Sequence, residues 1–154
     1  MTLSVKGDIL TKLGMFIQLM TVLYPSKYKG ITPSQLRILV NFLTLPIEHS
    51  MSRFSRLARQ EVVSRIENMT TINLNMQIYK MIDNGYINRD ADNVLYIDRH
   101  LTKGAFSLLA AIDPLQKYVT DYEASKLDMS WILDPNNPLK AAQSIVKIDF
   151  NPND

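Results

Sequence analysis

The chain has 154 residues, of which 46% are apolar and 21% charged, and this composition excludes a disordered or fibrous protein. Its net charge is only +2, but residues 1–103 carry 13 Lys and Arg against 8 Asp and Glu, whereas residues 104–154 carry 4 against 7. The absence of cysteine excludes disulfides, thiolate metal sites and cysteine nucleophiles.

The first predicted helix runs from about Ser4 to Tyr24, and Pro25 ends it. Its apolar residues recur at spacings of four and three, as on one face of a helix. They are Ile9, Leu13, Phe16, Met20 and Leu23. Two interpretations stay open. The helix covers the core of its own domain, or it pairs with a second copy, because heptad-like spacing also serves dimer interfaces.

The most apolar run of the chain, Leu13–Tyr24, bears on the compartment. It contains Gln18 and is too short to cross a bilayer. It also lacks the small-residue cleavage site of a signal peptide. We therefore expect an intracellular protein without a membrane partner.

The second predicted helix opens at Thr32. Thr-Pro-Ser-Gln supplies an N-cap, a proline at the first helical position and a glutamine that can close a capping box. Pro46 ends this helix. Its expected buried stripe consists of Leu36, Leu39, Val40 and Leu43.

A third helix is predicted from about Phe54 to Asn68, with an apolar inner stripe and several arginines outside it. The inner stripe is expected to contain Leu57, Ala58, Val62 and Ile66. The arginines outside the stripe are Arg53, Arg56, Arg59 and Arg65. Helices beside a DNA duplex often hold phosphates with arginine, so we expect these four to do so. The alternative is a solvated face with Glu61 and Glu67 as local partners.

The next helix is predicted from an N-cap at Thr71 to about Asn84. Apolar spacing places Leu74, Ile78, Met81 and Ile82 toward the core. The polar residues expected to contact base edges are Thr71, Asn73, Asn75, Gln77 and Lys80. Side-chain amides can bond both the donor and the acceptor of adenine, which favours base reading. The alternative is an ordinary solvated helix face.

Gly85 supplies the left-handed residue that ends a helix. Tyr86–Arg89 and Val94–Ile97 then read as two strands around the turn Asp90–Asn93. Arg89 is a further candidate phosphate contact. Because Asp90 and Asp92 would repel phosphate at the tip, contact is expected from the hairpin's base or not at all. The basic residues at that base are Arg89, Arg99, His100 and Lys103.

The rest of the chain is predicted to be mostly helical. Lys103–Ile112 is an apolar segment, and Asp113-Pro114 opens a helix to about Ser125. Trp131–Leu133 forms a hydrophobic plug, and Pro138–Val146 is expected to form a last short helix. The final six residues, DFNPND, are expected to be a loose tail.

Met69–Ile87 resembles the recognition helix and first wing strand of winged helix-turn-helix proteins. It shows a polar turn, Asn-Leu-Asn, apolar positions on one face and then Asn-Gly-Tyr-Ile. With Arg56–Ile66 and Asn93–Leu101, it is similar to small winged-helix proteins encoded by bacteriophages, and more distantly to MarR-type regulators. The acidic hairpin turn differs from the basic wing of MarR-type repressors.

The resemblance covers about Ile31 to Leu101. It implies a mainly α fold with a small β-hairpin, namely a winged helix-turn-helix with extra N- and C-terminal helices. The expected units are a packing or dimerisation helix in residues 1–30, the winged-helix domain in 31–101, and a helical extension and tail in 102–154. The cytoplasm of a bacterial or virus-infected cell is the compartment that this resemblance implies.

These features predict a sequence-specific protein that binds double-stranded DNA as a dimer and regulates transcription. The chain has no Gly-rich phosphate loop, G-x-S-x-G or H-E-x-x-H, and its two histidines, His49 and His100, stand far apart. We therefore expect no enzyme, no cofactor and no metal. The rival interpretation is a winged-helix scaffold for protein contact, such as a phage assembly or virion component or a polymerase accessory factor. In that case the C-terminal region, with Trp131–Leu133, would dock a protein partner.

Overall fold

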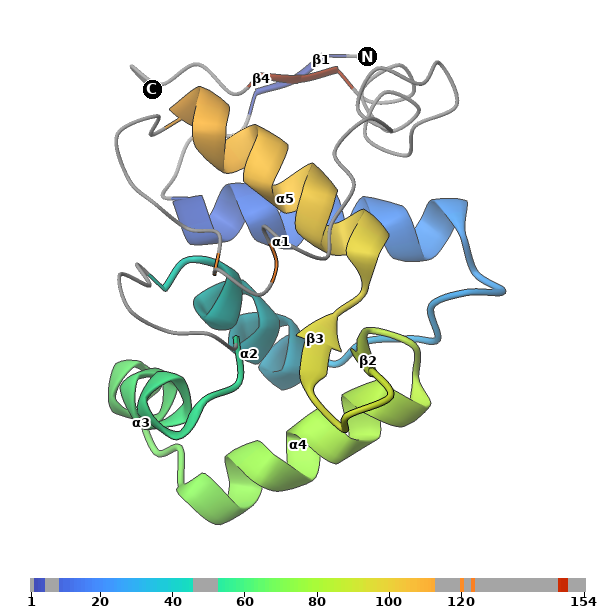
Figure 1. Cartoon of the computed structure of the whole chain (residues 1–154). Helices are drawn as coiled ribbons and strands as arrows, with labels where there is room; N and C mark the ends of the chain where they lie inside the picture. The colour runs from blue at the N-terminus through green and yellow to red at the C-terminus, as the bar shows by residue number, and fades with distance from the viewer. Residues whose placement is uncertain are drawn as a thin grey trace.

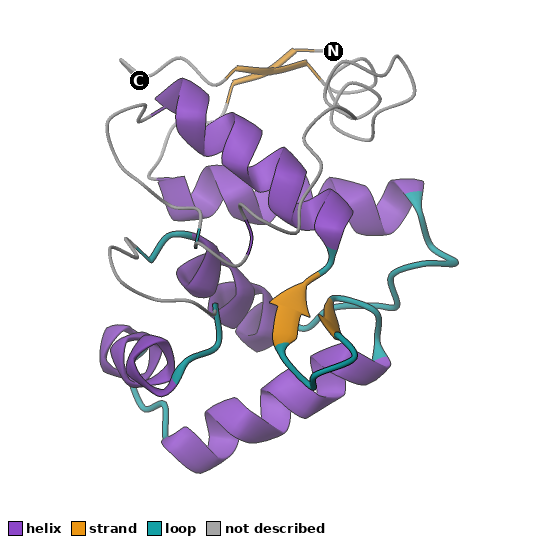
Figure 2. Cartoon of the chain, viewed as in Figure 1, coloured by secondary structure: helices purple, strands orange, loops and turns teal. Residues whose placement is uncertain are grey.

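The computed structural model describes residues 2–4, 9–45, 53–112, 120, 123 and 147–149. Within these residues the fold is mainly helical with one small antiparallel hairpin, as the sequence predicts (Figures 1 and 2). The elements are β1 (Thr2–Ser4), α1 (Ile9–Leu23), α2 (Pro33–Leu43), α3 (Arg56–Arg65), α4 (Thr71–Asp83), β2 (Ile87–Arg89), β3 (Leu95–Ile97), α5 (Arg99–Ile112) and β4 (Lys147–Asp149).

Helix α2 lies at the centre of the described residues. It packs against α1 on one side and against α3 and α4 on the other, while α5 lies on α1 (Figure 1). The β2–β3 hairpin contacts α4 through β2 and α5 through β3. This arrangement leaves α4 along one edge of the molecule (Figure 1). None of the helices that the structure describes is long and apolar enough to span a membrane.

The apolar stripe of α1 is internal. Leu13, Phe16 and Met20 of the predicted stripe are buried, as is Ile17, against α2 and α5, whereas Ile9 and Leu23 are half-buried. The interpretation that this helix covers its own core is therefore confirmed for the buried residues, and they are not exposed to a second copy.

The predicted start of the first helix at Ser4 is wrong, because Ser4 belongs to β1. Strand β1 pairs in parallel with β4, with Thr2 opposite Lys147 and Ser4 opposite Asp149. The backbone hydrogen bonds of these residues therefore serve a strand pair, and α1 begins only at Ile9. The sequence predicts a loose tail over the final six residues. This prediction is wrong for the first of them, Asp149, which belongs to β4.

The capping box predicted for α2 is confirmed. The Thr32 hydroxyl accepts a hydrogen bond from the backbone N–H of Gln35 at 3.1 Å, and the Thr32 N–H donates to Gln35 Oε1 at 3.1 Å. Three of the four predicted stripe residues, Leu39, Val40 and Leu43, are buried, whereas Leu36 is half-buried. Local capping thus sets where this central helix begins, and its apolar stripe sets which face turns inward.

Helix α3 is shorter than the sequence predicts and is turned differently. It ends at Arg65, because Ile66 is extended and Asn68 has a left-handed φ of 62°. The prediction that Leu57 faces inward is wrong, because this residue is 77% exposed. Ala58, Val62 and Ile66 are buried as expected.

The start of α4 is shifted by one residue from the prediction. Thr70, rather than Thr71, is the N-cap, and its hydroxyl accepts from the N–H of Asn73 at 3.1 Å. Leu74, Ile78 and Met81 are buried, which confirms their predicted inward direction, while Ile82 is half-buried.

Gly85 ends α4 with φ of +93°, as predicted. A Cβ at this position would collide with the backbone carbonyl of Lys27, so the chain after α1 passes directly over it. The predicted hairpin is also present, and it pairs Ile87 with Ile97 and Arg89 with Leu95. Its tip is built by Asp90, whose Oδ1 accepts from the N–H groups of Asp92 and Val94 at 2.8 and 2.9 Å.

Asp98 connects the hairpin to two other parts of the fold. Its Oδ2 accepts from the N–H of His100 at 3.1 Å in the first turn of α5 and from the Tyr28 hydroxyl at 2.6 Å. Its Oδ1 accepts from Asn88 Nδ2 at 3.3 Å and lies 3.6 Å from Lys27 Nζ. Burial, together with the negative charge and hydrogen bond of Asp98, raises the pKa of Tyr28.

We expect the free energy of unfolding to fall as pH rises above about 10, the pKa of an unfolded tyrosine. The folded-state pKa of Tyr28 is raised, so its contribution is fully present below pH ~10 and is lost above it. Burial raises the pKa of Tyr86 as well, so both tyrosines contribute. Urea unfolding between pH 8 and 11 measures this slope. Tyr28→Phe should flatten the slope, and an unchanged slope would contradict this account.

Helix α5 starts at Arg99, four residues before the apolar segment predicted at Lys103. Leu101, Ala105, Leu108 and Leu109 are buried. The predictions for residues 113–146 lie outside the described residues, apart from two positions: Thr120 and Glu123, both of which are buried.

Candidate nucleic-acid interface

Helix α4 has two apolar faces. Leu74, Ile78 and Met81 face the core, and on the opposite side Ile72, Met76 and Tyr79 are 82%, 48% and 60% exposed. We call these three exposed residues the outer face of α4. Both sets follow the spacing of four and three that marks one side of a helix. Only the first set was expected from the sequence.

The prediction that Asn73, Asn75 and Gln77 share one exposed face of α4 is therefore wrong. Asn73 and Asn75 point about 160° apart, since two residues separate by about 200° on a helix of 3.6 residues per turn. Asn73, Asn75 and Gln77 are all half-buried, on the two flanks of the outer face. Thr71 and Lys80 are exposed, as the prediction requires.

One flank of α4 ties this helix to α2. Gln77 Oε1 accepts from Gln35 Nε2 at 3.2 Å, and Gln77 Nε2 donates to Asn73 Oδ1 at 3.5 Å. Asn73 Nδ2 in turn contacts the sulfur of Met69 at 3.6 Å. These two amides thus bind neighbouring protein groups, which competes with the base contacts predicted for them.

The other flank of α4 borders a cleft beside the hairpin. This cleft has a volume of about 290 Å³ and is lined by Arg59, Asn75, Tyr79, Arg89 and Asn93, among others. Arg59 donates from Nη1 to Asn75 Oδ1 at 2.7 Å and from Nε to the carbonyl of Phe54 at 2.9 Å. The guanidinium of Arg89 lies 5.7 Å from the centre of the Tyr79 ring. Two guanidinium groups therefore line one cleft.

No protein family, curated protein or solved structure matches this chain. Its function is therefore inferred from the geometry of α4 and its surroundings.

Arg53 does not belong to this surface, and the prediction that it holds a phosphate is wrong. The residue is buried, and its side chain binds Glu123 through Nη2–Oε1 at 2.5 Å and Nε–Oε2 at 3.2 Å. Nη1 donates to the carbonyl of Phe42 at 2.8 Å. Arg53 is thus a core residue whose partner lies 70 positions along the chain.

The other predicted phosphate contacts are distributed over several surfaces. Arg56 on α3 and Arg89 on the hairpin are exposed. Arg65 forms an exposed i,i+4 pair with Glu61 at 3.1 Å and lines a separate groove beside α1 and α2. The structure therefore brings together Arg59 and Arg89, but not Arg65.

The basic residues expected at the base of the hairpin are only partly accessible. Lys103 is buried, whereas Arg99 and His100 are exposed. Partial desolvation of the imidazole and the positive charge of Lys27 lower the pKa of His100, against the effect of Asp98, which raises it. His100 is thus held toward its neutral form, which weakens any attraction to phosphate.

The hairpin beside this surface carries two aspartates at its tip. Asp92 is exposed at the hairpin tip, while Asp90 is occupied by the turn. Among the residues that the structure describes, no three His, Cys, Asp or Glu side chains are grouped so that they could hold a metal ion.

Proposed function

We propose that this chain is a winged helix-turn-helix protein that binds double-stranded DNA, with α4 in the major groove. The elements occur in the required order, α2, α3, α4 and then the β2–β3 hairpin. The observation that carries the proposal is the position of α4. Its inner face is buried, its outer face is open, and two guanidinium groups line the cleft along its flank.

The exposed side chains indicate how α4 would read DNA. Ile72 and Met76 are suited to apolar contact with thymine methyl groups, which lie in the major groove. Thr71 and Lys80 supply polar contacts at the margins. Since the amides of Asn73 and Gln77 bind within the protein, thymine methyls replace adenine as the expected main determinant.

Phosphate contacts are expected from Arg56, Arg59 and Arg89. Arg59 is positioned by Asn75, so Asn75 acts on the DNA backbone through this arginine rather than on a base. Binding at a defined site would make the protein a transcriptional regulator. Two copies on a palindromic site would meet through a surface other than the α1 stripe, which is buried.

We expect two variants to separate base reading from backbone binding. Ile72→Ser should reduce discrimination at one thymine position by roughly 1 kcal/mol, the value of about one buried methyl group. Arg89→Ala should weaken binding to all sequences and reduce the salt slope by about 1. Selection from randomised duplexes, followed by titration at several salt concentrations, measures both effects.

Arg65→Ala is the matched control for Arg89→Ala, because Arg65 is an exposed arginine outside the cleft. It should leave affinity close to that of the unmodified chain. No binding of any duplex at low salt and micromolar protein would refute the proposal. Equal effects of Arg65→Ala and Arg89→Ala would refute the assigned docking surface.

A second candidate function is protein contact through the outer face of α4. The favouring observation is that Ile72, Met76 and Tyr79 expose apolar surface side by side, as residues at protein interfaces do. Ile72→Asp should then abolish a defined hetero-assembly seen by light scattering, in a protein that binds no duplex. The docking role predicted for Trp131–Leu133 concerns residues outside the described part of the chain.

A further inference from the structure

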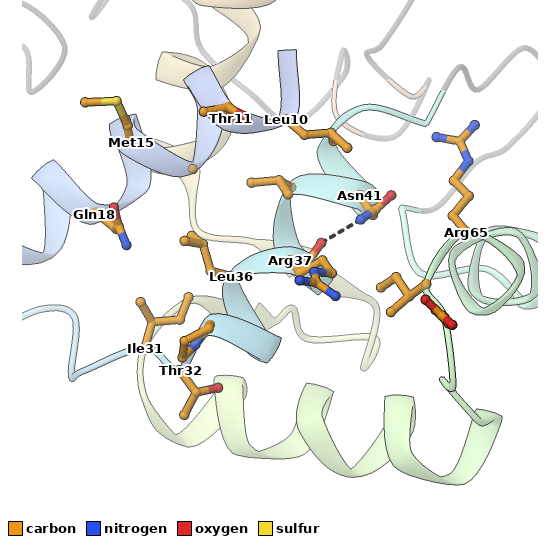
Figure 3. A pocket seen from close by; sticks show the side chains of 15 residues that line it. Leu10, Thr11, Met15, Gln18, Ile31, Thr32, Leu36, Arg37, Asn41 and Arg65 are labelled. Atoms are coloured by element: carbon orange, nitrogen blue, oxygen red, sulfur yellow. Dashed lines mark hydrogen bonds between the residues drawn. The ribbon is translucent and has the colours of Figure 1, made fainter. Parts of the chain in front are cut away.

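A second cavity lies on the side of α2 that faces α1. It has a volume of about 640 Å³, within the range of small-molecule sites. Its walls come from α1, the loop before α2, α2 itself and the C-terminal end of α3 (Figure 3). The apolar lining consists of Leu10, Met15, Ile31, Leu36, Val40 and Ile66. We call this cavity the α1–α2 groove.

Asn41 brings a buried polar group to the α1–α2 groove. It is 5% exposed, and its Nδ2 donates to the carbonyl of Arg37 at 2.8 Å (Figure 3). Its carboxamide oxygen accepts no hydrogen bond from any residue that the structure describes. A buried acceptor without a donor is costly, so a ligand that donates a hydrogen bond here gains affinity.

Arg37 supplies the second polar group, one helical turn before Asn41. Its guanidinium forms no ion pair or hydrogen bond with the described residues, and it lines the groove. Residues four positions apart on a helix are neighbours, so an anion at Arg37 stands close to Asn41. At the far wall lie Arg65, which pairs with Glu61, and the carboxylate of Glu67.

We propose that the α1–α2 groove binds a small organic acid with an alkyl body and an N–H donor beside its carboxylate, that is, an N-acyl amino acid. The carboxylate pairs with Arg37, the amide N–H donates to Asn41 Oδ1, and the acyl chain covers Leu10, Leu36 and Ile66. The carboxylate and the N–H of such a molecule are separated by a single carbon, which suits two side chains one helical turn apart. This proposal does not depend on the proposed DNA binding.

N-octanoylglycine is a suitable probe, measured by isothermal titration calorimetry with the full chain. Three analogues each remove one feature. N-octanoylglycinamide lacks the charge, octanoyloxyacetic acid replaces the N–H by an ester oxygen, and N-acetylglycine lacks the alkyl chain. Each analogue is expected to bind at least about tenfold more weakly than the probe.

Two variants assign those features to residues. Arg37→Gln should remove the preference for the acid over its carboxamide, and Asn41→Leu should remove the preference for the amide over the ester. Arg56→Gln is the matched control, because Arg56 is exposed and does not line the groove. If Asn41→Leu fails to fold, the amide-to-ester comparison on the unmodified chain tests the same contact.

Several results would overturn the proposal. They are equal affinity for amide and ester, an unchanged affinity in Arg37→Gln, and no binding of the probe at millimolar concentration. A second copy of the chain seated in the groove, seen as a dimer that the probe leaves intact, would also overturn it.

Discussion

Replacing Arg53 by alanine is expected to lower the free energy of unfolding by about 3–5 kcal/mol. Both partners of its ion pair are buried, with side chains 0% and 3% exposed. The guanidinium also lies 5.1 Å from the centre of the Phe106 ring. Removal of the cation leaves the Glu123 carboxylate buried without a counter-charge, and that penalty exceeds the lost attraction. Urea or thermal unfolding measures the change.

A double variant separates the pair from its burial cost. Arg53→Met combined with Glu123→Leu should recover most of the loss, since well-packed apolar residues often replace a buried pair without cost. Arg56→Ala, three residues away and exposed, is the control and should change stability by less than about 0.5 kcal/mol. A loss below about 1 kcal/mol in Arg53→Ala would contradict the buried ion pair.

The second large effect is expected for Gly85→Ala, with a loss of about 3 kcal/mol. An L-residue at φ of +93° costs roughly 1–2 kcal/mol. The Lys27 carbonyl also occupies the place of the new Cβ, and a backbone group cannot move aside as the end of a side chain does. The loop after α1 or the end of α4 must therefore shift, and denaturant unfolding would detect the lost stability.

Two further substitutions separate these causes. Gly30→Ala is the matched control, because an added Cβ there would meet no atom within 4 Å and the φ of Gly30 is ordinary, so stability should change little. Gly85→Asn tolerates a left-handed φ better than alanine does but keeps the collision with Lys27. If Gly85→Asn were as stable as the unmodified chain, the collision would not be a cause.

Local chemistry explains why much of the fold could be predicted from the sequence. The Thr32–Gln35 capping box, the helix stop at Gly85 and the hairpin turn at Asp90 each depend on residues within a few positions of one another. The bonds that form them are visible in the structure as expected. Such features depend on local hydrogen bonds and backbone preferences rather than on partners far along the chain.

Two of the wrong predictions concern residues whose partner lies far away in the chain. Arg53 looked like the other arginines of its segment, and only Glu123, 70 positions away, makes it a core residue. Thr2–Ser4 form a strand for the same reason, because they pair with the distant residues Lys147–Asp149. No local pattern distinguishes these residues from solvated ones.

The candidate site shows a different kind of ambiguity. Helix α4 carries two apolar stripes of similar spacing, and the spacing alone does not distinguish the stripe that is buried from the one that is exposed. Leu74, Ile78 and Met81 are buried, while Ile72, Met76 and Tyr79 are exposed. A helical projection of residues 71–83 would have revealed the second stripe and placed Asn73 and Asn75 on opposite flanks.

The parallel pairing of β1 with β4 sets an order of events during synthesis. A ribosome-bound chain that has emerged through residue 112 already contains α1 to α5, whose contacts do not require β4. Strand β1 pairs only after Lys147–Asp149 have left the exit tunnel. Its three residues therefore lack their partner strand while residues 5–146 are being made, so an open strand edge is available for edge-to-edge association during most of the synthesis of this chain.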